Sequence, residues 1–92
     1  MGDVVTTIGE QTSKRQRRKL LWAQNVREQL TFLGWSPKRF LHELNEAGCE
    51  VSRQAIDQWL DGTTSPSPEN QGYVAKVTRS APHLLFPVEV AS

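Results

Sequence analysis

Residues 51–60 read Val-Ser-Arg-Gln-Ala-Ile-Asp-Gln-Trp-Leu and predict a short amphipathic helix that begins after Ser52. Serine is a good cap here, because its hydroxyl can accept a hydrogen bond from a free backbone N–H of the first turn. At about 100° per residue, the apolar and polar side chains fall on opposite sides. The apolar side consists of Ala55, Ile56, Trp59 and Leu60, and the polar side of Arg53, Gln54, Asp57 and Gln58. Gly62 favours the left-handed conformation that ends such a helix.

The polar side of this helix carries side chains that can bind base edges in a DNA major groove. Arginine pairs with guanine and glutamine with adenine, each through two hydrogen bonds. Asp57 can accept from cytosine, or orient Arg53 one turn earlier by an i, i+4 contact. For an isolated segment, an ordinary helix with a solvated polar face is the alternative. The neighbouring segments favour DNA binding.

A second helix is predicted directly before the first. Ser36-Pro37 supplies an N-cap and a first helical residue, and Gly48 ends the helix. Its inward side chains are Phe40, Leu41, Leu44 and Ala47. Only residues 49–51 separate Gly48 from Ser52, so we expect the two helices to pack at a steep angle, as in a helix-turn-helix.

Further helices are predicted on both sides of this pair. The earlier one starts near Ser13 and ends at Gly34, with an apolar stripe of Trp22, Ala23, Val26, Leu30 and Leu33. After a loop over 63–66, Ser67-Pro68 repeats the start signal of Ser36-Pro37. The inward residues of that helix are Tyr73, Val74 and Val77. Ser80 is expected to cap a last short turn through Leu84, Leu85 and Phe86, which Pro87 ends.

The charge is unevenly distributed although the net charge is only +1. Five of the eleven Lys and Arg residues lie at 14–19, as Lys14, Arg15, Arg17, Arg18 and Lys19. Residues 1–12 show weak helical pattern, so we expect 1–19 to form a flexible basic arm. Such an arm binds nucleic acid by displacing counterions from phosphates. A solvated or nuclear-import-like run is the alternative.

Other classes of protein find little support in these 92 residues, which suffice for one domain. No membrane span or signal peptide is expected, and the single Cys49 suits a reducing cytoplasm. His42 and His83 are far apart, no zinc spacing or glycine-rich phosphate loop occurs, and no carboxylate pair suggests acid–base chemistry. We therefore expect no enzyme, cofactor, metal or small-molecule ligand. The expected division is an arm at 1–19, a domain at 20–86 and a tail at 87–92.

Together these segments resemble the Cro and lambda-repressor family of helix-turn-helix DNA-binding domains, the XRE-like class. The resemblance covers about residues 20–86. It rests on Gly34-Trp35-Ser36, the spaced apolar residues of the second helix, Val51-Ser52-Arg53 with Ile56 and Trp59, and the loop with Gly62 and Pro66-Ser67. It implies a compact all-α bundle of four to five helices.

The resemblance also implies a division of the contact residues. Arg53, Gln54, Asp57 and Gln58 would contact bases, and Ser52, Thr63 and Thr64 would contact phosphates. Pro37 stands where many members have a phosphate-binding glutamine, so that contact would come from backbone N–H groups, Lys38 or Arg39. The second helix and turn are about four residues longer than in the shortest members. Gln71 and Thr78 replace usually apolar residues, which leaves that end of the core thin.

The sequence therefore predicts a sequence-specific regulator that binds double-stranded DNA, most simply a small Cro-like repressor of phage or prophage type. A DNA-binding antitoxin or an excision factor would bind DNA through the same helix-turn-helix. The chain could also be the DNA-binding part of a longer protein. The alternative class is a protein-interaction module. A homodimer is expected through 84–90, the one apolar run that the helices leave over, with a monomer on an asymmetric site as the alternative. In that alternative, Leu84 and Phe86 close the core.

Overall fold

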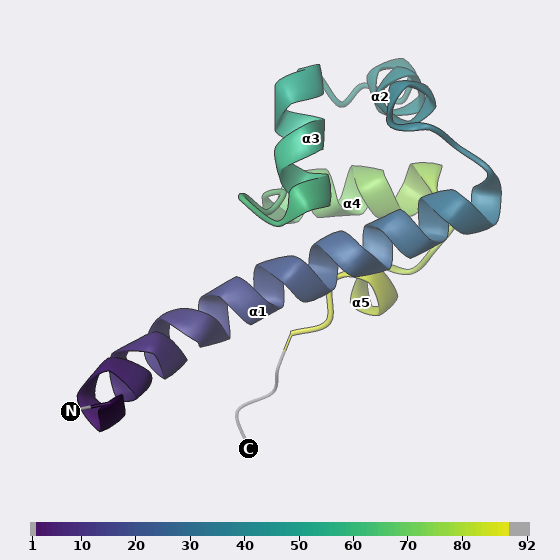
Figure 1. The fold of residues 1–92 in the computed structure, drawn as a ribbon. Coiled ribbons are helices and arrows are strands. Elements are labelled where there is room, and N and C mark those ends of the chain that lie inside the picture. The colour runs from purple at the N-terminus through teal and green to yellow at the C-terminus, as the bar shows by residue number, and fades with distance from the viewer. Residues whose placement is uncertain (1, 89–92) are drawn as a thin grey trace.

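The computed structural model describes the backbone of residues 2–88 and the side chains of residues 14–88. This part of the chain forms helices joined by short turns and contains no strand (Figure 1), so the predicted all-α class is confirmed. The helices are α1 (Gly2–Leu33), α2 (Pro37–Glu46), α3 (Arg53–Asp61), α4 (Pro68–Val77) and α5 (Pro82–Leu85).

The start of α1 corrects the expected flexible arm. Where the sequence predicts an arm over 1–19 and a helix that begins near Ser13, the helix already begins at Gly2 and runs unbroken through the basic residues. No proline interrupts 2–33, and the Lys, Arg and Gln side chains of 14–19 are good helix formers. Adding turns to a helix that is already formed costs far less than starting one. The basic residues of 14–19 therefore stand on a helix that projects beyond the rest of the molecule (Figure 1).

The predicted helix starts and stops around the central pair are confirmed. The hydroxyls of Ser36, Ser52 and Ser67 each accept from the backbone N–H three residues later, with O···N distances of 3.1, 3.1 and 3.3 Å. Gly48 and Gly62 adopt φ of +100° and +85° after α2 and α3. These turns allow α3 to cross α2 steeply and to contact α1 with its other end (Figure 1).

The core lies between α1, α2, α3 and α4 and contains most of the residues that periodicity assigns to it, whereas Leu33, Ala47 and Ala55 are only partly buried. Each of the first four helices contributes at least one of its predicted inward residues to the buried set. These are Ala23, Val26, Leu30, Phe40, Leu44, Ile56, Trp59, Leu60 and Val74. Trp22, Leu41, Tyr73 and Val77 pack against this core and remain partly exposed.

The end of the core predicted to be thin is closed by the C-terminal segment. Thr78 is fully buried, and its hydroxyl donates to the carbonyl of Val74 at 2.7 Å, so burial leaves no polar group unpaired. Leu85 and Phe86 are buried beside it, whereas Leu84 is 63% exposed. The expectation that 84–90 is one free apolar patch is therefore wrong for Leu85 and Phe86, and residues 89 and 90 lie outside the described residues.

The start of α5 also differs from the prediction. Ala81, not Ser80, occupies the N-cap, and no side chain caps the helix. Pro82 takes the first helical position, whose N–H would have no partner within the helix anyway. The polar contacts that hold α5 come instead from the side of α1.

Three side-chain donors of α1 attach the C-terminal segment to the molecule. Their partners are backbone carbonyls at or just after the ends of α4 and α5. Carbonyls at a helix end receive no hydrogen bond from an N–H of the same helix, so they are available to these donors. The bonds run from Trp22 Nε1 to Pro87, from Asn25 to Leu85 and from Gln29 to Thr78, at 3.0, 3.0 and 2.8 Å. The ring of Phe86 also meets that of Trp22 edge-on, with centroids 5.4 Å apart.

Candidate nucleic-acid interface

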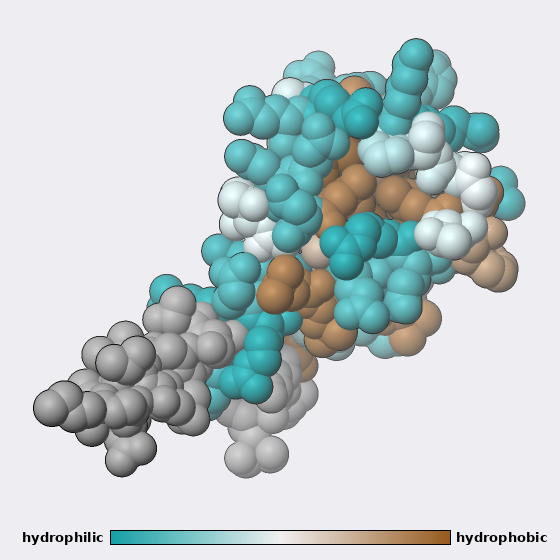
Figure 2. Space-filling model, viewed as in Figure 1, coloured by the Kyte–Doolittle hydropathy of each residue, from teal (hydrophilic) through white to brown (hydrophobic). Residues whose placement is uncertain are grey.

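The polar face of α3 is presented to solvent by the burial of its apolar face. Ile56, Trp59 and Leu60 anchor the helix, because each is at most 9% exposed. The residues predicted to contact bases, Arg53, Gln54, Asp57 and Gln58, stand on the outside, Gln58 partly buried and the others exposed. Hydrophilic side chains accordingly cover the surface over α3 in Figure 2.

The predicted contact between Arg53 and Asp57 is present. The guanidinium Nε lies 2.9 Å from Oδ1 of Asp57, and both side chains are about half exposed, at 51% and 54%. The bond uses Nε only, so the terminal nitrogens of Arg53 keep their N–H groups for other acceptors. An exposed i, i+4 pair of this kind is worth only about 0.3–0.5 kcal/mol. The pair therefore orients Arg53 without preventing it from exchanging partners.

At the N-terminus of α2, the two cations predicted to contact phosphate differ in their surroundings. Lys38 is exposed. Arg39 donates from Nε to Glu43 at 3.0 Å, and its guanidinium lies 5.1 Å from the ring centroid of Trp35. A carboxylate and an aromatic face thus hold Arg39 in place, and its charge is partly compensated before any phosphate approaches.

The turn after α3 is built from backbone hydrogen bonds. The N–H groups of Thr63 and Thr64 donate to the carbonyl of Gln58 at 3.0 and 3.3 Å, and that of Thr63 also to Asp61 Oδ1 at 2.7 Å. Hydrogen bonds from the side chain and the backbone of Thr63 lower the pKa of Asp61. An ionised carboxylate therefore lies beside two residues predicted to contact phosphate.

Arg27 is a contributor that the sequence analysis missed. Its Nη1 donates to the carbonyl of Leu60 in the last turn of α3, and its charge also helps to lower the pKa of Asp61. A cation at a helix C-terminus is favourable because the last carbonyls carry partial negative charge. Arg27 thus links the middle of α1 to the end of α3. Its position in the chain offers no signal for this, since the partner lies 33 residues away.

The helical form of residues 14–19 distributes the five basic side chains over different sides of α1. Lys19 lines a small void together with Thr64 and Ser65, so it lies beside the turn after α3. Leu20 abuts Gly62 in that turn. Arg15 precedes Lys19 by one turn, which leaves the two side chains about 40° apart around the helix. Lys19, with Arg15 behind it, is therefore the cation of this run nearest to α3.

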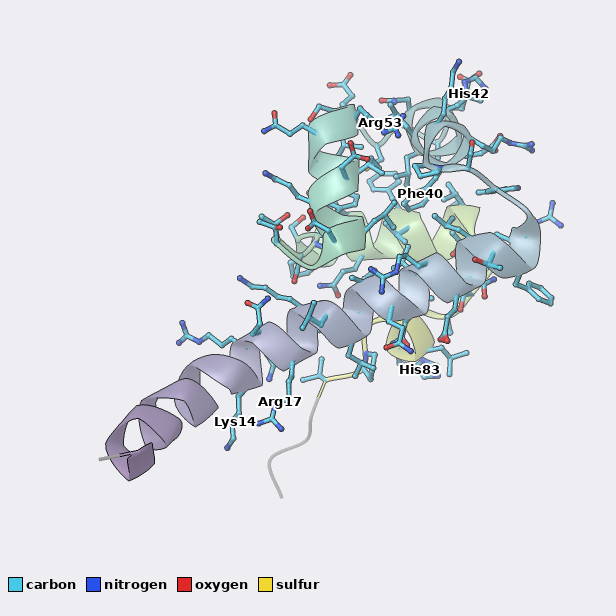
Figure 3. The ribbon with its side chains drawn as sticks, in the orientation of Figure 1. Lys14, Arg17, Phe40, His42, Arg53 and His83 are labelled. Carbon is cyan, nitrogen blue, oxygen red and sulfur yellow. The ribbon has the colours of Figure 1, made fainter. Side chains whose placement is uncertain are left out.

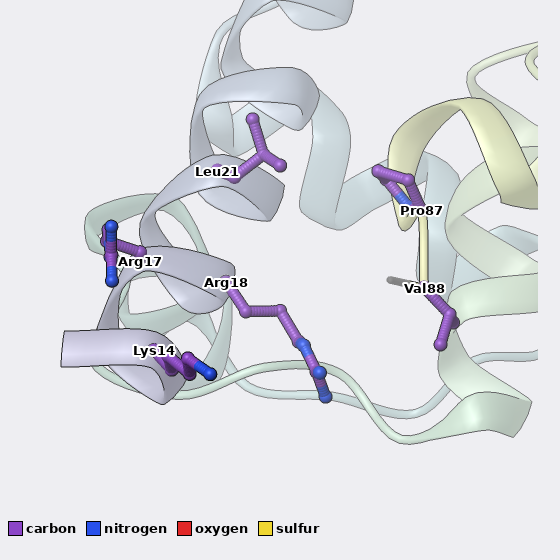
Figure 4. A pocket seen from close by; sticks show the side chains of 6 residues that line it. All are labelled: Lys14, Arg17, Arg18, Leu21, Pro87 and Val88. Carbon is purple, nitrogen blue, oxygen red and sulfur yellow. The ribbon is translucent and has the colours of Figure 1, made fainter. Parts of the chain in front are cut away.

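The other three cations of the run lie elsewhere. Lys14, Arg17 and Arg18 line a groove of about 520 Å³, whose remaining lining residues are Leu21, Pro87 and Val88 (Figure 4). In Figure 3, Lys14 and Arg17 project from the side of α1 that faces away from α3. The five cations predicted to bind phosphates as one basic arm thus form two groups.

Within 14–88, no cluster of His, Cys, Asp and Glu side chains has the arrangement of a metal site. None of the described helices combines the length and apolarity needed to cross a membrane. Cys49 is buried, its thiol donates to Asn70 Oδ1 at 3.5 Å, and burial followed by the charge of Glu69 raises its pKa.

Comparison of the chain with protein-family models, with curated proteins and with solved structures found no match.

Proposed function

We propose that this protein is a sequence-specific DNA-binding regulator that inserts α3 into the major groove of double-stranded DNA. The observation that carries the proposal is the outer face of α3. Arg53 and Gln54, both exposed, and the partly buried Gln58 form one outward-facing array over a buried apolar face, and each can pair with a base edge. The resemblance of residues 20–86 to Cro-like domains adds support, and makes a transcriptional repressor of phage or prophage type the simplest assignment.

Contacts to the DNA backbone would flank this array on two sides. Lys38 and the N-terminus of α2 lie on one side, since α2 packs against α3. Lys19 and the Thr63-Thr64 turn lie at the other end of α3. Each phosphate that is neutralised adds about 0.9 to the slope of log affinity against log salt concentration. The carboxylates of Asp57 and Asp61 on the same surface would repel phosphates. They would therefore weaken non-specific attraction to DNA and favour the orientation in which the cations meet the phosphates.

The proposed setting is the cytoplasm of a bacterium or of a phage-infected host, where the regulator finds its DNA. The same helix could also serve a DNA-binding antitoxin or an excision factor. Selection of bound sequences from random duplexes would identify the preferred site for the measurements below.

The test compares Arg53 variants on the selected site and on random duplex. Arg53→Ala should weaken binding to the selected site by about 1–3 kcal/mol, roughly 5- to 150-fold, and relax preference at one base pair. Arg53→Lys is the matched control for charge, because lysine keeps the cation and loses the planar fork. It should bind random DNA like the wild type and still lose affinity for the selected site. Equal losses on both duplexes for Arg53→Ala and Gln54→Ala would refute the assignment.

We further propose that two copies share one operator. A single helix with a few base-contacting side chains separates its site poorly from competing genomic sites, at about 1–3 kcal/mol per base pair. Exposed apolar side chains remain near α5, where Leu84 (63% exposed) and Phe32 of α1 (82% exposed) line the same shallow depression. DNA titration with light scattering should give two chains per site, and Leu84→Ser should lower that ratio. One chain per asymmetric site would rule the dimer out.

A further inference from the structure

The groove between α1 and the C-terminal segment combines two chemistries in one place. Its cationic side chains are Lys14, Arg17 and Arg18, and its apolar side chains are Leu21, Pro87 and Val88. Of the described residues that line it, none is acidic. Leu21 is 46% and Val88 67% exposed, so apolar surface here is left in contact with water. A volume of about 520 Å³ lies within the range that binding sites commonly occupy.

The two walls of the groove are held in place relative to each other. The wall with Pro87 and Val88 is attached to α1 by the bond from Trp22 Nε1 to the carbonyl of Pro87 at 3.0 Å. The edge-on contact between Trp22 and Phe86 fixes the residue just before it. From the other wall, Arg18 extends toward the segment that carries Val88 (Figure 4). A ligand would thus meet a preformed site and lose little binding energy to ordering it.

Charge and apolarity together favour one class of ligand. A DNA backbone would satisfy the cations, but its phosphates would leave Leu21 and Val88 uncovered. The groove also lies on the side of α1 away from α3 (Figure 3), so a duplex bound along α3 would not fill it. A peptide with carboxylates and an apolar side chain would satisfy both walls at once.

We propose that this groove is a docking site for an acidic segment of a partner protein. An apolar side chain of the segment lies between Leu21 and Val88, and its flanking carboxylates pair with Lys14 and Arg18. The assignment is independent of DNA binding by α3. It would allow the regulator to hold a partner protein on one side of α1 while the other side faces DNA.

The test measures fluorescence anisotropy of a labelled synthetic peptide in which glutamate alternates with leucine and phenylalanine. The reference peptide has serine in place of leucine and phenylalanine. Burial of one such apolar side chain is worth about 1.5–3 kcal/mol, so the full-length protein should bind the first peptide at least about tenfold more tightly. Arg18→Glu, Lys14→Glu and Leu21→Ser should each reduce that binding. These side chains are exposed, so thermal melts should show folded variants.

Arg15→Glu is the matched control, since it makes the same change of charge on the same helix outside the groove. It should weaken peptide binding clearly less than Arg18→Glu. Equal affinity for the two peptides, or equal losses in Arg15→Glu and Arg18→Glu, would overturn the docking site. If the groove variants weaken binding to random duplex and leave peptide binding unchanged, the groove belongs to the DNA surface instead. Because the duplex is measured separately, failure of the docking site is distinguishable from failure of DNA binding by α3.

Discussion

At the scale of single residues, Gly62 shows how one position connects two distant helices. It ends α3 in the left-handed conformation, with φ of +85°. A Cβ atom there would lie 2.7 Å from Cδ2 and 3.4 Å from Cα of Leu20, so α1 approaches the turn as closely as glycine permits. The conformational requirement follows from the helix-stop pattern, whereas the close approach of α1 does not.

Gly62→Ala should therefore destabilise the protein by about 1–2 kcal/mol through the left-handed backbone, and further if Leu20 has to move. Gly72→Ala is the matched control. Gly72 lies within α4 with open space around its Cα, so alanine there should stabilise by up to about 1 kcal/mol. Urea denaturation of both variants measures the difference. Equal stabilities would mean that neither the conformation nor the contact at Gly62 matters.

Arg53 and Asp57 show how far a residue pair can be predicted from spacing. An i, i+4 pair on one helix face needs only the helix itself, and the structure contains it. Arg39 shows the opposite case. Its ion pair with Glu43 also has i, i+4 spacing, so the helix alone is enough to form it. The position of its guanidinium over the ring of Trp35 depends instead on how the chain turns between α1 and α2.

At the scale of the elements, α1 organises the molecule to a greater degree than its sequence suggests. Its apolar stripe packs on the core, and Arg27 reaches the end of α3. On another side, Trp22, Asn25 and Gln29 follow each other along the helix and hold the C-terminal segment. Amide side chains on a helix surface, such as Asn25 and Gln29, are normally expected to be solvated, and Trp22 is predicted to face inward without a named partner for its N–H. Only the carbonyls of the C-terminal segment give these donors a structural role.

Trp22→Phe and Gln29→Ala test this attachment. Phenylalanine keeps an aromatic ring against Phe86 and removes the donor to Pro87, and alanine removes the donor to Thr78. Each variant should lose about 0.5–1.5 kcal/mol of stability, as is typical for one hydrogen bond. Gln24→Ala, at an exposed position of the same helix, should stay within about 0.5 kcal/mol of wild type. Urea denaturation decides, and losses no larger than that of Gln24→Ala would show that the attachment adds no stability.

At the scale of the whole molecule, the fold depends on one core that every helix shares. Trp59 of α3 lines a small internal void with residues of α1, α2, α4 and the C-terminal segment, among them Val26, Phe40, Val74 and Phe86. Loss of its ring would therefore affect all of these elements together. The outer face of α3 is positioned only as long as this core is intact.

Trp59→Ala should cost about 3–5 kcal/mol, a large share of the 5–15 kcal/mol that a small domain has. We expect loss of the cooperative thermal transition in circular dichroism, and loss of DNA binding with it. Phe32→Ala removes an aromatic ring that is 82% exposed and should change stability by no more than about 0.5 kcal/mol. A Trp59→Ala protein that still unfolds cooperatively near the wild-type temperature would contradict this account of the core.

Local rules were sufficient for much of this protein. The serine caps and the apolar spacing predicted α2, α3 and α4 and most of their buried residues, and glycine stops predicted the ends of α2 and α3, because caps and periodicity act within a few residues of the chain. Ala75, which is buried in α4, was not among the predicted inward residues. The outward placement of Arg53, Gln54, Asp57 and Gln58 followed from the same periodicity. That these residues contact DNA remains a proposal.

Contacts between distant parts of the chain account for the rest. Whether Leu85 and Phe86 form a free patch or close the core depended on the space beside Thr78, which sequence spacing does not measure. The basic side chains of residues 14–19 form two groups because this segment is helical, and successive side chains of a helix point to different sides of its axis. The groove beside Arg18 exists because a bond from Trp22 brings Pro87, 65 residues later, against α1. Such pairings depend on packing between distant segments, and no local pattern predicts them.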